Sequence, residues 1–172
     1  MQSSIIRIAL IGPESTGKTT LANQLADHYK TVWVREFARD YVAKLNRKYT
    51  YEDVLQCITM QAAEEKEALT SAHRFLFADT ELILHKIWLW DVFKTYPPEL
   101  DEEINKIAYD LYLLLYPDLP FVEDPVRENP HRRMYFFELY KQELEKRNLP
   151  FKLIKGDHRF QKAVEHIDSR FK

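Results

Sequence analysis

Short apolar runs alternate with longer segments of helical periodicity along this chain. A short, nearly continuous apolar run is typical of a strand buried in a parallel sheet, whereas apolar residues three or four positions apart indicate a helix with one buried face. The expected strands cover residues 5–11, 31–34, 74–78, 110–116 and 151–155. The expected helices cover residues 18–29, 36–45, 51–72, 80–93, 98–108 and 132–147, and a last helix covers about 160–171.

This alternation predicts an α/β fold. Strands that alternate with helices form a parallel sheet through right-handed crossovers, with helices on both faces. We therefore expect a three-layer sandwich around a five-stranded parallel sheet, and ligands bound beyond the carboxyl ends of its strands. A length of 172 residues fits one domain over residues 1–172.

A phosphate-binding motif directly follows the first expected strand. Residues 12–19 read GPESTGKT and match the Walker A pattern, and a helical pattern begins at Lys18. In such a loop the backbone N–H groups and the helix N-terminus hold nucleotide phosphates. The lysine reaches the β- and γ-phosphates, and the hydroxyl of the residue after it, here Thr19, binds Mg²⁺. The predicted cofactors are ATP and Mg²⁺. The predicted nucleotide-binding residues are Gly12, Pro13, Glu14, Ser15, Thr16, Gly17, Lys18, Thr19 and Thr20.

An acid ends the third expected strand. Asp79 follows the apolar residues 75–78, which is the Walker B form, and Mg²⁺ commonly takes one or two carboxylates. We therefore predict that Asp79 joins Thr19 at the metal. The alternative is that Asp79 caps the helix expected from Thr80, and both roles are compatible.

Glu36 follows the second expected strand, on the side where an acceptor would bind. Its carboxylate could accept the proton of an attacking hydroxyl or bond to a sugar diol. The alternative is a glutamate that complements the positive end of a helix. Trp88 and Trp90 are two positions apart on a helix and face different sides, so one is a candidate for lining a pocket for an aromatic acceptor.

Residues 123–133 follow the fourth expected strand and read as a charged, proline-containing lid. Arginines stabilise the charge on a transferring phosphoryl group, so Arg127, Arg132 and Arg133 are candidates for this task when the lid closes. Asp124 is a candidate for orienting an arginine or a substrate hydroxyl. The alternative is an ordinary charged surface loop.

Gly156 follows the fifth expected strand, where the backbone could approach an adenine base closely. An ordinary turn into the last helix explains the same residue equally well.

Charge and composition narrow the function classes. The net charge of −2 predicts neither nucleic acid nor an anionic membrane as partner. Cys57 is the one cysteine, so no disulfide framework is expected. No apolar run approaches a membrane span, and the chain enters its first strand without room for a signal peptide. We expect a cytoplasmic protein, and the sequence leaves its oligomeric state open.

Several motifs occur here in one order: GPESTGKTTLA, then REFARDY, a helix with Gln61, FADT, and YDLYLLLYPDLPFVED followed by an arginine. In these motifs the chain resembles, over about residues 4–168, the ribosylnicotinamide kinase domain of NadR-type proteins, within the P-loop kinase superfamily. The resemblance implies a P-loop kinase-type fold. It also implies transfer of the ATP γ-phosphoryl group to the 5′-hydroxyl of nicotinamide riboside, which gives nicotinamide mononucleotide in NAD biosynthesis.

The resemblance also implies site residues. It implies that Gly12, Gly17, Lys18 and Thr19 bind the phosphates and magnesium. It also implies that Glu36 and Asp79 lie at the acceptor and metal site and that residues 127–133 form the lid. The sequence departs from the family where Arg35 replaces an aromatic residue of some relatives and where Pro125 replaces a frequent glycine. The adenylyltransferase domain that precedes this module in bifunctional relatives is expected to be absent.

Two other functions stay open from the residues alone. The chain could be a kinase of another nucleoside or small metabolite, or a regulatory P-loop ATPase that has no acceptor. It lacks the Asn-Lys-x-Asp signature that reads guanine. Whether Glu36 or Asp79 acts as the base is also open.

Overall fold

The computed structural model describes residues 4–107 and 109–172. Its strands are β1 (Ile6–Ile11), β2 (Trp33–Val34), β3 (Phe75–Asp79), β4 (Leu111–Leu115) and β5 (Phe151–Ile154). Its helices are α1 (Lys18–Tyr29), α2 (Phe37–Lys44), α3 (Tyr51–Ala68), α4 (Leu82–Phe93), α5 (Glu99–Lys106), α6 (Arg133–Lys146) and α7 (Arg159–Arg170). Within these residues, no helix combines the length and the apolar character needed to cross a membrane.

The order of strands and helices agrees with the predicted order, and the differences lie at element ends. Helix α3 ends at Ala68 because the N–H groups of Thr70 and Ser71 bond three residues back, to Glu67 and Ala68, and form a turn. Helix α4 begins at Leu82, two residues later than predicted. The predicted end of the fifth helix, Ala108, lies outside the described residues.

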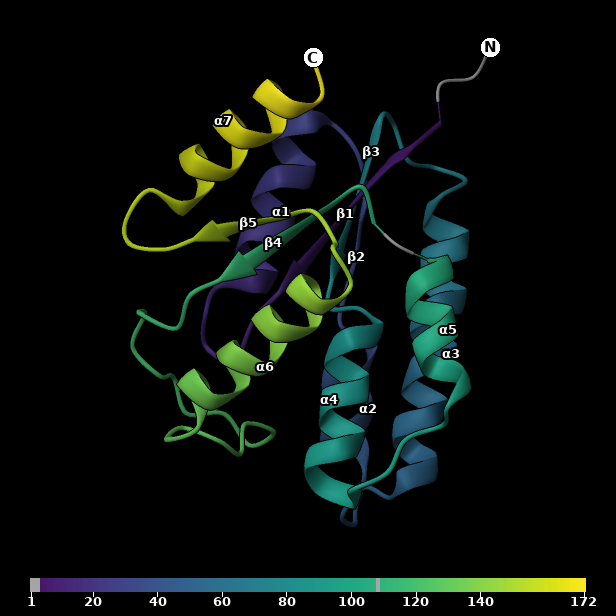
Figure 1. Ribbon diagram of the computed structural model, residues 1–172. Coiled ribbons are helices and arrows are strands. Elements are labelled where there is room, and N and C mark those ends of the chain that lie inside the picture. Colours follow the sequence, from purple (N-terminus) through teal and green to yellow (C-terminus); the bar gives the residue numbers. More distant parts are fainter. Residues whose placement is uncertain (1–3, 108) are drawn as a thin grey trace.

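The five strands form one sheet in the order β2-β3-β1-β4-β5, and every pair is parallel. The predicted fold class is therefore confirmed. Strand β1 is central, paired with β3 on one side and with β4 on the other. As Figure 1 shows, the carboxyl end of β1 lies at the same end of the sheet as the loop between β4 and α6, and α7 ends at the opposite end.

Helices cover both faces of the sheet, which explains why the central strands are apolar without alternation. Ile8 and Leu10 of β1 face the core formed with α1 and α7. Ala9 and Ile11 of the same strand face a second core, formed with residues of α3, α4, α5 and α6. Figure 1 shows these two groups of helices on opposite sides of the sheet.

Helix α3 fixes the start of α2. A capping box begins α3: the Thr50 hydroxyl accepts from the N–H of Asp53, whose carboxylate accepts from the N–H of Thr50. Further along α3, the buried Gln61 side chain accepts a bond of 2.8 Å from the N–H of Phe37, the first residue of α2. Glu36, which directly precedes Phe37, is therefore fixed relative to the sheet.

Gly12 connects β1 to the phosphate loop where the backbone of β4 leaves no room for a side chain. Its φ is +154°, and a Cβ at this position would lie 2.8 Å from the carbonyl oxygen of Leu115. Only glycine satisfies both the conformation and the contact. The loop therefore rests directly on the end of β4.

We expect Gly12→Ala to lower the free energy of unfolding by more than about 2 kcal/mol, since the backbone and the end of β4 would both have to shift. Gly156→Ala is the matched control: its φ is also positive, at +69°, but its Cβ would meet only the flexible end of Lys162 at 3.5 Å. The control substitution should lower the free energy of unfolding by about 1 kcal/mol. Urea denaturation followed by circular dichroism measures both, and equal losses would contradict the close approach.

Candidate active site

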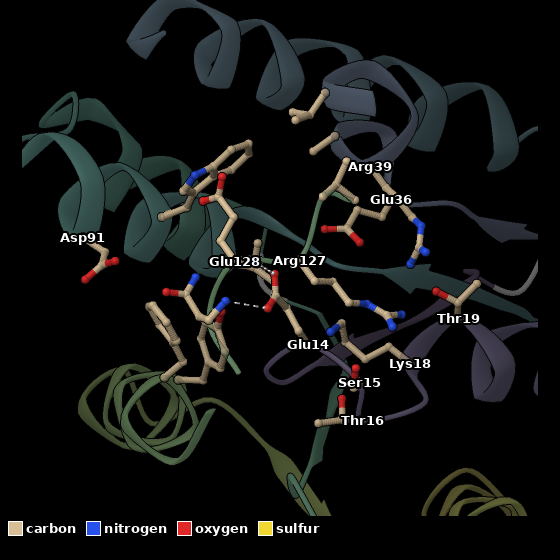
Figure 2. Close-up of a pocket in the computed structure, with 18 of the residues that line it drawn as sticks. Glu14, Ser15, Thr16, Lys18, Thr19, Glu36, Arg39, Asp91, Arg127 and Glu128 are labelled. Carbon is tan, nitrogen blue, oxygen red and sulfur yellow. Dashed lines mark hydrogen bonds between the residues drawn. The ribbon is translucent and has the colours of Figure 1, made fainter. Parts of the chain in front are cut away.

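A cavity of about 500 Å³ lies at the carboxyl end of the sheet. The phosphate loop forms one wall and residues of α2, α4, α6 and the loop before α6 form the others. Figure 2 shows Thr19 and Asp91 at opposite sides of this space, with Lys18, Glu36 and Arg127 between them. The predicted site residues that line it are Glu14, Ser15, Thr16, Gly17, Lys18, Thr19, Thr20, Glu36 and Arg127.

Lys18 begins α1 and its side chain folds back over the phosphate loop. Its ammonium group donates to the carbonyl oxygens of Gly12 at 2.8 Å and Pro13 at 3.0 Å. The Thr16 hydroxyl donates to the same Pro13 oxygen at 2.8 Å. Gly17 precedes the helix with a φ of +83°, a conformation natural to glycine. Gly12 and Pro13 therefore shape the loop from behind and do not line the cavity.

Thr19 and Asp79 lie together beneath the loop, as a magnesium site requires. The Thr19 hydroxyl donates to Asp79 Oδ2 at 2.5 Å, and Asp79 is 1% exposed. Burial raises the pKa of the Asp79 carboxyl, while Lys18, Thr19 and Arg39 oppose this shift. The other oxygen, Oδ1, is buried and has no hydrogen-bond partner among the residues that the structure describes. The Thr19 hydroxyl and the Asp79 carboxylate, with one of its oxygens unpaired, are the kind of oxygen ligands that Mg²⁺ takes.

The alternative role of Asp79, as a helix cap, is wrong. Glu81 is the N-cap residue of α4, and its carboxylate accepts from the N–H of Ile83 at 2.9 Å. Thr80 has a φ of +83°, which separates the end of β3 from the helix. Two residues thus lie between Asp79 and the first helical position, so its carboxylate points at Thr19 instead.

Glu36 is the N-cap residue of α2, but its side chain makes no capping hydrogen bond. The carboxyl group lines the cavity instead, half-buried, close to Lys18 and Arg39. Burial raises its pKa to about 7; Lys18 lowers it and Asp79 raises it. A carboxyl group with this pKa can take up or release a proton near neutral pH.

The predicted lid segment, residues 123–133, lies against the phosphate loop. The Glu14 carboxylate accepts from the N–H groups of Glu128 and Asn129, each at 3.3 Å. Just before the segment, the N–H of Val122 donates to the Ser15 hydroxyl at 3.1 Å. Asp124 forms an ion pair with Arg39 of α2. The segment therefore contacts both the phosphate loop and α2.

The three arginines of this segment occupy different environments. Arg127 lines the cavity and donates to the Val122 carbonyl at 2.7 Å. Arg133 donates to the carbonyls of Ser15 at 3.2 Å and Leu119 at 2.9 Å, behind the phosphate loop. Arg127 therefore faces the cavity, whereas Arg133 contacts the loop backbone and does not line the cavity.

Arg132 does not face the phosphate loop, which corrects its predicted placement. Its guanidinium forms two hydrogen bonds, of 2.9 and 2.6 Å, with the Asp91 carboxylate and lies over the rings of Tyr135 and Phe136. Asp91 is nearly buried, with 11% of its side chain exposed, and needs this counter-charge. Arg132 thus joins α4 to the start of α6.

The side of the cavity away from the phosphate loop is aromatic. Tyr49, Trp88, Phe136 and Tyr140 line it, and the rings of Tyr49 and Trp88 meet edge to face at 4.9 Å. Two carboxylates, of Asp91 and Glu128, line the same region, and the Tyr49 hydroxyl bonds to Glu128 at 3.1 Å. These aromatic residues and acids come from four separate chain segments.

Arg35 and Gly156 lie outside this cavity. The Arg35 guanidinium lies over the Trp33 ring at 5.5 Å and does not contribute to the wall of this cavity. The Gly156 N–H donates to Asp118 at 2.7 Å, and its adenine contact stays a prediction. Near it, Arg159 donates to the Thr16 carbonyl at 3.0 Å. Sequence reasoning gave Arg159 no role, since no motif links residues 143 positions apart.

The parallel sheet with its phosphate loop, paired Thr19 and Asp79, and arginine-bearing segment defines a P-loop domain of the kinase-like type. The chain belongs to the family described as AAA domain, whose profile matches residues 7–160.

Among curated proteins, the chain is 28% identical over 169 residues to the trifunctional NAD biosynthesis/regulator protein NadR of Escherichia coli K12, and equally to that of Salmonella typhimurium LT2. The alignment covers 93% of this chain and 41% of each relative, so the chain spans about two fifths of their length. The resemblance to NadR-type proteins inferred from the motifs is confirmed by these matches.

Solved structures share the fold. A NadR protein crystallised in complex with NR superposes with a TM-score of 0.76 at 20% identity, over 96% of this chain and 51% of that one. Thymidylate kinase from Ehrlichia chaffeensis superposes with a TM-score of 0.66 at 13% identity, over 95% and 99% of the two chains. A deoxyadenosine kinase from M. mycoides gives 0.66 at 12% identity, over 96% and 98%.

The raised pKa of Glu36 predicts a pH-dependent stability. Between its ordinary pKa of 4.5 and about 7, the folded protein holds a proton that the unfolded chain has released, so stability falls as pH rises through this range. Glu36→Gln removes this loss. The free energy of unfolding of the variant, relative to that of wild type, should therefore rise by on the order of 2 kcal/mol between pH 4.5 and about pH 8.

Chemical denaturation at the two pH values measures this difference. Glu165→Gln, at an exposed position of α7, is the control and should show no such gain. A stability difference between Glu36→Gln and wild type that stays constant with pH would show that folding does not bury the charge of Glu36.

Proposed function

We propose that this chain is a kinase that transfers the γ-phosphoryl group of ATP to the 5′-hydroxyl of nicotinamide riboside. The observation that carries the proposal is that a phosphate loop, a carboxylate of raised pKa and an aromatic wall all line the same cavity. A phosphoryl donor and a nucleoside acceptor need such adjacent compartments, because transfer requires the hydroxyl in line with the γ-phosphate.

The donor side would bind ATP through the backbone of residues 12–19. Lys18, which now bonds to loop carbonyls, would turn to the β- and γ-phosphates. Arg127 lies next to Lys18 and would stabilise charge on the transferring group. Thr19 and Asp79 would hold Mg²⁺, which supplies charge neutralisation for the phosphates when bound.

Glu36 would act on the acceptor hydroxyl. Its carboxylate lies in the cavity beside Lys18 and Arg39 and titrates near neutral pH. It could accept the hydroxyl proton or orient the ribose through a hydrogen bond. Because the transition state for phosphoryl transfer is loose, orientation should contribute more to the rate than proton removal does.

The aromatic wall supports nicotinamide riboside as acceptor. Its nicotinamide ring is a pyridinium cation, which aromatic faces attract through their quadrupoles and carboxylates attract through charge. Trp88 and Tyr49 supply such faces, and Glu128 supplies an acid bonded to Tyr49. The likeness to a NadR protein in complex with NR points to the same substrate.

The proposal also covers domain organisation. We propose that residues 1–172 form one catalytic domain with a lid at 123–133. Its support is that Lys18, Glu36 and Arg127 line one cavity at the carboxyl end of one sheet.

The proposed acceptor can be tested directly with ATP, Mg²⁺ and a panel of nicotinamide riboside, adenosine, deoxyadenosine, thymidine, cytidine and uridine. We expect nicotinamide riboside to have the highest kcat/KM and mass spectrometry to identify its 5′-monophosphate as product. Lys18→Ala should be inactive towards every acceptor, since it removes the charge that reaches the phosphates.

Other results of this screen favour the two other functions. A higher kcat/KM for another nucleoside would reject nicotinamide riboside and keep the kinase. Slow ATP hydrolysis that no acceptor changes would favour a regulatory ATPase.

Two substitutions at Glu36 separate orientation from proton removal. If orientation dominates, Glu36→Gln, which can still bond to a hydroxyl, should lower kcat about tenfold and Glu36→Ala about a hundredfold. Steady-state kinetics at saturating ATP measures both, with Asp40→Asn, on the exposed side of α2, as the control. Equal losses in the two Glu36 variants would indicate that the carboxylate acts as a base.

A further inference from the structure

The carbonyl groups of the phosphate loop are held by side chains, several of them cationic. Lys18 donates to the oxygens of Gly12 and Pro13. Further along the loop, the carbonyl oxygens of Ser15 and Thr16 accept hydrogen bonds from arginines of the C-terminal half of the chain. Arg133 donates to the Ser15 oxygen at 3.2 Å, and Arg159 donates to the Thr16 oxygen at 3.0 Å. An arginine therefore holds each of two consecutive loop carbonyls.

Arg159 has the more extensive contacts of the two. Its guanidinium also donates to the Tyr116 carbonyl at 3.0 Å, at the end of β4, and forms an ion pair with Asp118. The other oxygen of Asp118 accepts from the N–H of Gly156 at 2.7 Å. The Arg159 side chain is 11% exposed, whereas that of Asp118 is 31% exposed, so the guanidinium is largely buried and its ion pair with Asp118 lies towards the surface. One planar group thus joins the phosphate loop, β4 and the turn that begins α7.

This contact matters because a phosphate loop works through the direction of its peptide groups. Its N–H groups must point at the phosphate oxygens, so its carbonyls must point away and bond elsewhere. Thr16 is 1% exposed, and water cannot easily replace a lost donor at its carbonyl. The neighbouring Ser15 has a φ of +54°, an uncommon conformation for a residue with a side chain, which its surroundings must maintain.

We propose that Arg159 is a positioning residue for nucleotide binding: its guanidinium holds the Thr16 carbonyl outward and so directs the N–H groups of the loop at the phosphates. Arg133 holds the Ser15 carbonyl in the same way. Arg159 acts through the loop and does not line the cavity. The inference rests on the proposed function only in that the loop binds a nucleotide; it is independent of the acceptor.

The test measures binding of Mg·ATP and of inorganic triphosphate, which has no base or sugar, to the full chain by calorimetry. Arg159→Gln should weaken both ligands by about tenfold, because it removes charge-assisted bonds to the loop and the end of β4. Arg159→Lys keeps the charge but cannot span three acceptors, so it should weaken both by about threefold. In turnover assays the KM for ATP should rise and the KM for the acceptor should stay unchanged.

Arg147 provides a matched control. Its side chain is equally buried, at 8% exposed, and bonds to Glu143, Asp101 and Asn105, far from the loop. Arg147→Gln should lower the melting temperature as much as Arg159→Gln does and leave both affinities within about twofold of wild type. If Arg159→Gln does not fold, Arg159→Lys decides alone.

Three results would overturn the proposal. Affinities within about twofold of wild type in both Arg159 variants would show that the loop is positioned without this residue. A loss for Mg·ATP without a loss for triphosphate would place Arg159 at the base. An equal loss of both affinities in Arg147→Gln would show that the effect of Arg159→Gln comes from general destabilisation of the fold. A wild-type chain that binds triphosphate and phosphorylates no nucleoside would reject the proposed function and leave this inference standing.

Discussion

The site depends on the placement of β1, which is hydrogen-bonded on both sides and buried on both faces. Its pairing with β3 brings Leu10 level with Asp79, and its pairing with β4 brings Ile11 level with Leu114. The loop that leaves β1 therefore starts from a rigid strand, passes over the end of β4 at Gly12, and enters α1 with Thr19 beside Asp79. A displacement of β1 would move the phosphate loop away from Asp79. Order in the loop is thus a consequence of packing in the sheet.

The cavity concentrates acids and bases at one edge of the sheet. Glu14, Glu36, Asp91 and Glu128 line it, and Asp79 lies buried at its edge. Lys18, Arg39 and Arg127 come from three different segments and share the same space. Burial raises the pKa of both Glu36 and Asp79, while Lys18 opposes the shift in each. Each carboxylate therefore depends on a neighbouring cation, and a triphosphate with its metal would change this balance of charge. Such a balance suits a site that handles a highly charged group in a partly water-excluded space.

The segment before α6 connects the two halves of the cavity. Glu14 and Ser15 of the phosphate loop bond to its backbone, Asp124 pairs with Arg39 of α2, and Glu128 bonds to Tyr49. Arg132 extends the same region to α4 through Asp91. Movement of this segment would therefore change contacts with the phosphate loop, α2 and α4 together. The arrangement gives a physical route by which a ligand at one end of the cavity would change the other end.

The sequence by itself determined the local elements and the residues whose chemistry depends on close neighbours along the chain. The phosphate loop, the acid that ends β3 and the alternation of strands and helices are all visible within short windows, because each reflects hydrogen bonding or burial over a few residues. Only the tertiary structure decided which distant side chains meet. In the folded chain Arg132 pairs with Asp91, and Glu81 caps α4. The rings of Trp88 and Tyr49 are in contact, and Arg159 donates to the Thr16 carbonyl. These contacts join residues up to 143 positions apart, and they follow from the strand order and from the charge that each buried group requires.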